Sequence, residues 1–220
     1  MQRIYLQSEQ VIDYVSENIK DSIQDCVVVH DAKYHHNTDY TSAVSIIRNN
    51  ILSLEELKRQ RIKKYSDDFL QIMSDHESHA NGSDGISLAV VGLKDLGEKE
   101  IEYDPFSTHH IDFLIDSDIK ACRSSVNYGN EYISFEQIPA EKIRAVDIRI
   151  KKYIDMLVSK REIDEESIRT LIQRYNCIRN IAISLREEGL DIPLREMSYD
   201  GCCSLDIDML ASSPKLVLKS

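Results

Sequence analysis

The chain contains little glycine, little proline and no tryptophan. Seven glycines and four prolines among 220 residues are roughly half the share of average proteins. An all-β sandwich needs many tight turns, which these residues supply, so the composition disfavours that class. No apolar run reaches the ~18 residues of a membrane-spanning helix, and residues 1–10 lack the basic and apolar segments of an export signal. We therefore expect a cytoplasmic protein with long helices and no membrane span.

Acidic residues outnumber basic ones. Thirty-eight Asp and Glu against 27 Lys and Arg give a net charge of −11, while 42% of residues are hydrophobic. That hydrophobic share and the length support one folded domain, alone or with a helical annex. An acidic chain lacks the broad positive field that captures phosphate backbones. Small molecules or basic proteins are therefore favoured as partners over tightly held nucleic acid.

The cysteines are odd in number and lack the CxxC spacing of many metal and redox sites. They are Cys26, Cys122, Cys177, Cys202 and Cys203. The vicinal pair Cys202–Cys203 cannot bridge to itself without strain, which fits a reduced cytosol. Cys26 and Cys122 have apolar neighbours in the sequence, which predicts unreactive thiols and argues against a cysteine hydrolase.

Hydrophobic periodicity predicts a mixed α+β fold. Helical spacing covers residues 8–23, 41–51, 54–73, 151–160 and 164–188. Strand patterns cover residues 26–30, 86–93, 111–115, 131–138 and 142–150. The intervening segments, including the polar residues 31–39, are predicted loops, and the signal fades after Leu190. We expect a core with an N-terminal helix in residues 1–150 and a C-terminal helical extension and tail in residues 151–220.

The histidines raise the question of a metal site. All seven fall between residues 30 and 110: His30, His35, His36, His76, His79, His109 and His110. His76 and His79 form H-E-x-H, one residue short of the zinc motif H-E-x-x-H, in which both histidines share a helical face. The spacing therefore predicts no metal, although a metal-dependent hydrolase or nuclease remains the alternative.

Other common catalytic motifs are absent from the sequence. It contains no G-x-S-x-G, no G-x-x-x-x-G-K-[ST] and no G-x-G-x-x-G. A serine hydrolase, a P-loop nucleotide enzyme and a Rossmann dinucleotide fold are therefore unsupported.

Three separated positions and their flanking segments carry a resemblance. His30 ends the first predicted strand, Ser87 lies in the next, and Glu131 opens a later one. The segments TDYTSAVSIIRNNIL after His30 and NEYISFEQIPAEKIRAVDI around Glu131 complete the pattern. The chain thus resembles, over about residues 26–150, the NAD-dependent ADP-ribosyltransferases of the diphtheria-toxin and poly(ADP-ribose)-polymerase type, near the DNA-targeting toxin transferases.

The resemblance implies a split β-sheet core, NAD as substrate and roles for particular residues. Cleavage of the nicotinamide–ribose bond builds positive charge on the ribose, which the Glu131 carboxylate stabilises as the catalytic group. His30 binds the adenosine ribose, and Ser87 supports the nicotinamide amide. Arg123 pairs with the pyrophosphate, and Tyr34 is a candidate to stack on nicotinamide, as are Tyr103 and Tyr128. Asn127 and Tyr128, just before Glu131, face the acceptor.

Two departures from the family leave the acceptor open. Ser87 stands where the histidine form usually has tyrosine, and Gly129 replaces the second glutamate of the arginine-modifying form. A protein acceptor is slightly favoured over nucleic acid, whose contact with the basic run Lys58–Lys64 would be brief. The sequence favours a toxin or defence effector and leaves a regulatory role open, with a catalytically inactive NAD- or partner-binding module as an alternative. The apolar stripes of the two C-terminal helices either cover the core or dock an antidote or partner protein.

Overall fold

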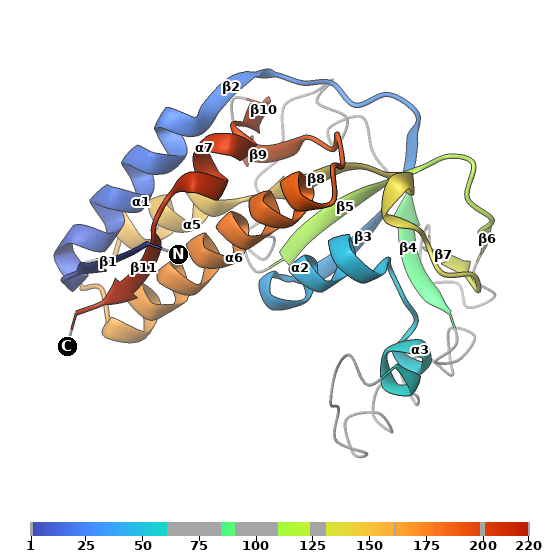
Figure 1. Cartoon of the computed structure of the whole chain (residues 1–220), viewed down its shortest axis with the longest axis horizontal. Helices are drawn as coiled ribbons and strands as arrows, with labels where there is room; N and C mark the ends of the chain where they lie inside the picture. Colours follow the sequence, from blue (N-terminus) through green and yellow to red (C-terminus); the bar gives the residue numbers. More distant parts are fainter. Residues whose placement is uncertain are drawn as a thin grey trace.

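A computed structural model describes residues 2–60, 85–90, 110–123, 131–160, 162–198 and 201–219. Within these residues the fold is α+β, with a nine-stranded, mostly antiparallel sheet and a separate two-stranded one (Figure 1). The large sheet runs, in spatial order, β2 (Ile23–Cys26), β10 (Gly201–Leu205), β9 (Leu194–Ser198), β8 (Ile143–Ile148), β5 (His110–Asp116), β3 (Ala32–Asp39), β4 (Ile86–Val90), β7 (Glu131–Ser134) and β6 (Cys122–Arg123). This arrangement confirms the expected α+β class. It does not confirm the more specific split β-sheet core that the resemblance implies.

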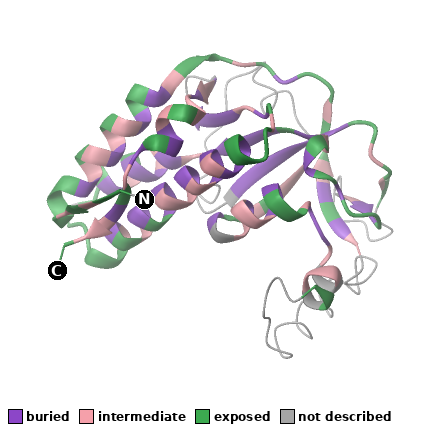
Figure 2. Ribbon diagram, in the orientation of Figure 1, coloured by how far each residue is buried: buried purple, intermediate pink, exposed green. Residues whose placement is uncertain are grey.

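Helices pack on one face of the large sheet. They are α1 (Ser8–Ser22), α2 (Tyr40–Asn49), α5 (Ile150–Val158) and α6 (Glu165–Glu187), with the short α7 (Ile207–Ser212) packed against α6 and α1. The short α3 (Leu54–Arg59) lies apart from these helices. Buried positions follow the inner sides of the helices and the central strands (Figure 2). The chain ends meet where β1 (Arg3–Leu6) pairs in parallel with β11 (Lys215–Leu218). No helix in the described part of the chain has the length and apolarity to span a bilayer.

Local sequence signals set the ends of α6. The Asp164 side chain accepts a hydrogen bond from Ser167 N at 2.6 Å, which satisfies one of the amides left unpaired at a helix start. Gly189 follows the helix at φ +64, a left-handed conformation that glycine adopts without strain. The predicted cap and stop are both confirmed.

The apolar stripes of α5 and α6 are used inside the molecule. Ile154, Leu157, Ile168, Leu171, Ile172, Tyr175, Ile178, Ile181 and Leu185 are all buried in the main core. Val158, which belongs to the same pattern, is 63% exposed. The structure therefore uses these stripes to cover the sheet rather than to present a docking face.

The prediction of a strand over residues 26–30 followed by a loop over 31–39 was wrong. β2 ends at Cys26, and the following β-branched residues cross the other face of the sheet, where Val29 packs against Leu114 and Ala145. Asp31, at φ 65, turns the chain into β3. That strand is polar, yet it pairs with β5 along its length. Partners supplied by other strands override weak local propensity here.

The C-terminal segment holds more structure than its pattern indicated. Residues 190–220 were predicted as a tail, but β9 and β10 extend the large sheet and α7 and β11 follow. The predicted helix over 54–73 is described through Arg59, and its remainder lies outside the described residues. Strands predicted from Ile86, over 111–115, from Glu131 and over 142–150 are confirmed, the last ending at Ile148.

Candidate functional site

Three neighbouring strands bring the candidate residues together. β3, β4 and β7 lie side by side, and the register pairs His35 with Ala89 and Ala89 with Glu131. His35 and Glu131 thus occupy one row across three strands, about 10 Å apart at Cα. Ser87 pairs with Ile133 and is therefore diagonal to Glu131, at about 7–8 Å. This spacing suits a small molecule laid across the strands.

His36 marks the point where β3 parts from β4. β3 pairs with β4 at Tyr34↔Val90 and His35↔Ala89, whereas its pairing with β5 continues to Asp39↔His110. Nδ1 of His36 is 3.0 Å from the Ser87 carbonyl oxygen. Because a carbonyl only accepts, Nδ1 carries the proton in this contact. The ring therefore bridges the two strands where their ladder ends.

Burial favours the neutral form of His36. It lowers the pKa of the imidazole, outweighing the opposing effect of the Ser87 carbonyl. The neutral ring that results donates through Nδ1 and leaves Nε2 as an acceptor. A neutral histidine of this kind can orient a hydroxyl group of a ligand without placing a charge beside it.

His35 stands in front of a buried ion pair. Its Nδ1 lies 3.8 Å from Oδ1 of Asp112 on β5, and Oδ2 of Asp112 lies 2.5 Å from Nη1 of Arg149. The His35 side chain is 21% exposed and that of Asp112 6%. Burial acts to raise the pKa of Asp112, but His35 and Arg149 outweigh it and hold the pKa below its usual value. A solvent-facing histidine backed by an ionised carboxylate can accept a proton.

A second ion pair lies beside the first on the same face of the sheet, because Asp147 is opposite Asp112 in register. Arg195 on β9 donates to both carboxylate oxygens of Asp147 on β8, at 2.7 and 2.8 Å, and to the Val27 carbonyl at 3.0 Å. The two side chains are 0% and 1% exposed. The pair ties β8 and β9 to the segment that leads into β3.

Glu196, which follows Arg195 on β9, caps the N-terminus of helix α5. Its carboxylate oxygens accept hydrogen bonds from the backbone N–H groups of Ile150 and Lys151, both at 3.1 Å. Burial raises the pKa of Glu196 to about 8 in spite of these bonds. The helix that follows Arg149 is thereby anchored to β9.

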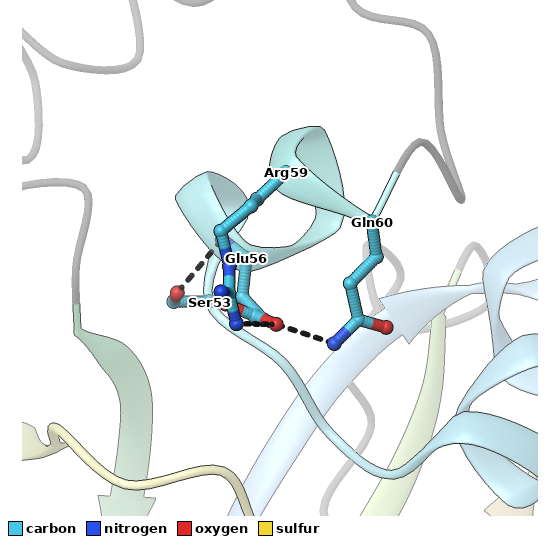
Figure 3. Close-up of polar contacts among 4 residues, drawn as sticks. All are labelled: Ser53, Glu56, Arg59 and Gln60. Atoms are coloured by element: carbon cyan, nitrogen blue, oxygen red, sulfur yellow. Dashed lines mark hydrogen bonds and ion pairs between the residues drawn. The ribbon is translucent and has the colours of Figure 1, made fainter.

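A cavity of about 370 Å³ opens at the other end of β4 and β7 from Glu131. Its lining residues are Ser53, Glu56, Arg59, Ile86, Phe135, Glu136 and Gln137. Arg59 donates to both carboxylate oxygens of Glu56, at 2.7 and 2.6 Å, and the Ser53 hydroxyl accepts from Glu56 N at 3.3 Å (Figure 3). Gln60 also donates to Glu56. The polar groups that line this side of the cavity are therefore hydrogen-bonded to one another.

Some predicted site residues lie in this arrangement and others do not. Ser87 is exposed on β4. Arg123 on β6 is also exposed, but it is opposite Tyr132 in register, so its side chain leaves the sheet on the other face from Glu131 and Ser87. His30 is not strand-terminal as predicted: it is exposed in the irregular segment before β3. Tyr34 is 2% exposed in the main core, with its ring 5.3 Å from that of Tyr132, a position that leaves it no face for nicotinamide.

Other candidates lie outside the described residues. They are Asn127, Tyr128, Tyr103, His76, His79 and His109. Within the ranges that the structure describes, no three histidine, cysteine or acidic side chains gather as metal ligands would. Cys26 and Cys122, predicted to have apolar surroundings, are both exposed.

Sequence reasoning missed His35, His36 and Asp112. The two histidines lie in a segment with no apolar alternation, and Asp112 lies inside the apolar run IDFLI. A charged residue within such a run was the one available signal, because a buried carboxylate requires a partner. No protein-family model matches the chain, and no curated protein is significantly similar to it.

Proposed function

We propose that this protein is an NAD-dependent ADP-ribosyltransferase. The observation that supports this best is the adjacency of β3, β4 and β7, which carry His36, Ser87 and Glu131 in that chain order. The pairing of β3 with β4 ends before His36 while its pairing with β5 continues, and we place the dinucleotide at this opening. The sequence resemblance requires a histidine, a hydroxyl residue and a glutamate in this order.

In the proposed reaction Glu131 acts on the ribose next to nicotinamide. The bond between C1′ and the nicotinamide nitrogen breaks, and its electron pair leaves with neutral nicotinamide. Positive charge builds on the ribose, and a carboxylate stabilises that charge. The lone pair of the acceptor then forms the new bond to C1′, and the acceptor loses one proton.

His36 and Ser87 hold NAD in this proposal. The neutral His36 takes the ribose-binding role that the sequence first assigned to His30, because its ring contacts the Ser87 backbone carbonyl at the point where β3 parts from β4. Ser87, exposed on β4, supports the nicotinamide amide.

His35 is the group that takes the acceptor's proton. It lies in the same row as Glu131, and Asp112 behind it stabilises the imidazolium that forms. The acceptor is a macromolecule, and a protein is slightly favoured because the chain carries a net charge of −11. A toxin or defence effector would use this activity.

The test uses NAD labelled in its adenylate part. Purified protein is incubated with this NAD and a cell lysate, and nicotinamide release and label transfer are measured after protease or nuclease treatment. Glu131→Gln is expected to lower turnover by ~10²-fold or more while NAD affinity, measured by calorimetry, stays unchanged. Glu141→Gln, a change of an exposed glutamate in the turn Ala140–Lys142, is the matched control.

Equal nicotinamide release by wild type and Glu131→Gln would refute the assignment of Glu131. NAD binding without any turnover by the wild type would favour the inactive binding module instead. Stoichiometric metal in the purified protein, with activity lost to a chelator, would favour the metal-dependent hydrolase.

A further inference from the structure

Two cysteines far apart in the sequence meet at the edge of the nine-stranded sheet. Sγ of Cys26, the last residue of β2, lies 3.2 Å from Sγ of Cys203 on β10. The two residues are direct partners in the antiparallel register, and both are free thiols. Cys26 is exposed and Cys203 half-buried, so a small reagent has access to the pair.

The type of pairing suits a covalent bond. The neighbouring pair carries the ladder hydrogen bond, from Val27 N to Cys202 O at 3.3 Å. Cys26 and Cys203 therefore form a non-hydrogen-bonded pair, in which Cα atoms lie about 4.5 Å apart and side chains are closest. Disulfides span Cα separations of about 4.4–6.8 Å, so the backbone already has the required geometry.

The vicinal cysteine does not compete for this bond. Successive side chains on a strand point to opposite faces of the sheet, and Cys202 is 2% exposed. A small reagent therefore reaches Cys26 and Cys203 before Cys202.

We infer that Cys26 and Cys203 are a redox modification site that forms a reversible disulfide with a low-molecular-weight disulfide, such as glutathione disulfide, as the oxidant. This inference does not depend on the proposed transferase activity. It rests on the position, the register and the accessibility of the two thiols.

The exchange proceeds in two steps. The Cys26 thiolate attacks one sulfur of glutathione disulfide, forms a mixed disulfide and releases one glutathione thiolate. Cys203 then loses its proton and attacks Sγ of Cys26, which forms the protein disulfide and releases the second glutathione. The protein dithiol gives up two electrons and two protons, and one glutathione disulfide becomes two glutathione thiols.

The environment sets the order of these steps. Burial, together with the contact with Cys26, raises the pKa of the Cys203 thiol to about 11. Cys203 therefore carries little thiolate at neutral pH and reacts second, once the mixed disulfide lies beside it. Exposed Cys26 is the first point of attack.

The disulfide would secure the edge strand. β2 leads into the segment whose Val27 carbonyl binds Arg195 and whose Val29 packs against Leu114 and Ala145. Closing so long a loop restricts the unfolded chain, so the oxidised protein is expected to melt about 5–10 °C higher than the reduced one.

The full-length protein is equilibrated without oxygen in glutathione buffers of graded disulfide-to-thiol ratio, quenched with acid and alkylated. Oxidation should lower the number of free thiols from five to three, the loss of one pair. Peptide mapping should recover a peptide that links Cys26 to Cys203, and dithiothreitol should restore all thiols. The mapping is made on wild type, so it does not depend on whether a variant folds.

The matched variants separate this pair from general thiol oxidation. Cys122→Ser removes another exposed thiol and should still lose one pair and gain the same thermal stability. Cys26→Ser should show no intramolecular disulfide and no rise in melting temperature. Five thiols retained at the oxidising end of the series, a mapped Cys202–Cys203 bridge, or equal pair loss in Cys26→Ser would each overturn the inference.

Discussion

Removal of one partner of the buried Asp147–Arg195 pair is expected to destabilise the fold strongly. Arg195→Met deletes three hydrogen bonds, two to Asp147 and one to Val27 O, at a position that is 0% exposed. The carboxylate of Asp147, which is 1% exposed, then lies buried without its arginine partner. Breaking such a pair costs about 3–5 kcal/mol of the free energy of unfolding.

The double variant Asp147→Leu/Arg195→Met distinguishes this mechanism from a simple loss of contacts. It removes both charges and keeps apolar volume, so its cost should be clearly smaller than that of Arg195→Met alone. Both are compared with wild type by urea unfolding followed by circular dichroism. Arg186→Met, a change of a half-exposed arginine 3.9 Å from Asp208, is the control and should cost about 0–1 kcal/mol.

The stability of Arg195→Met should depend on pH because the substitution leaves the buried Asp147 carboxyl without its arginine. Burial raises the pKa of Asp147, and the charge of Arg195 opposes that rise. Without Arg195 the folded pKa lies further above the unfolded one, so stability is lost as pH rises through this interval. The deficit of Arg195→Met relative to wild type should therefore be smaller at pH ~5 than at pH ~8. A deficit below ~1 kcal/mol, or a double variant worse than the single one, would refute the reasoning.

Three further predictions concern ligand binding, pH and the acceptor. His36→Ala should raise the KM for NAD about 5–30-fold, through loss of about 1–2 kcal/mol of ribose binding, whereas His30→Ala should leave KM unchanged; equal effects in steady-state kinetics would contradict the assignment to β3. Glu196 has a pKa of about 8 in the fold against 4.5 ordinarily, so the free energy of unfolding of wild type should fall as pH rises between these values. Glu196→Gln should show a smaller fall when urea unfolding is measured across this pH range. An equal fall in the two proteins would contradict the prediction. Replacement of Lys58, Arg59, Arg61, Lys63 and Lys64 by Gln should leave protein labelling nearly intact, and a salt-dependent loss of labelling on oligonucleotides alone would point to a nucleic-acid acceptor.

Local sequence patterns alone were enough to predict several helices and strands. The apolar spacing of Val11, Val15 and Ile19 predicts α1, and these residues are buried as expected. Asp164 and Gly189 mark the ends of α6 because a cap and a left-handed residue act within one helical turn. The alternation in IDFLI likewise predicts β5. In each case the information lies within a few residues of the element.

The tertiary structure alone decided the remaining features. β3 is a strand because β5 and β4 supply its hydrogen bonds. Its polar sequence has no alternation of apolar and polar residues that would predict a strand. His35 lies beside Asp112, and Cys26 beside Cys203, although each partner is distant in sequence, and the roles proposed for His35 and Cys26 depend on these contacts. Ser87 and Glu131 were visible in the sequence as single residues, but the row that Glu131 shares with His35, and the diagonal position of Ser87, depend on register. Contacts of this kind are set by the pairing of distant segments, which local periodicity does not encode.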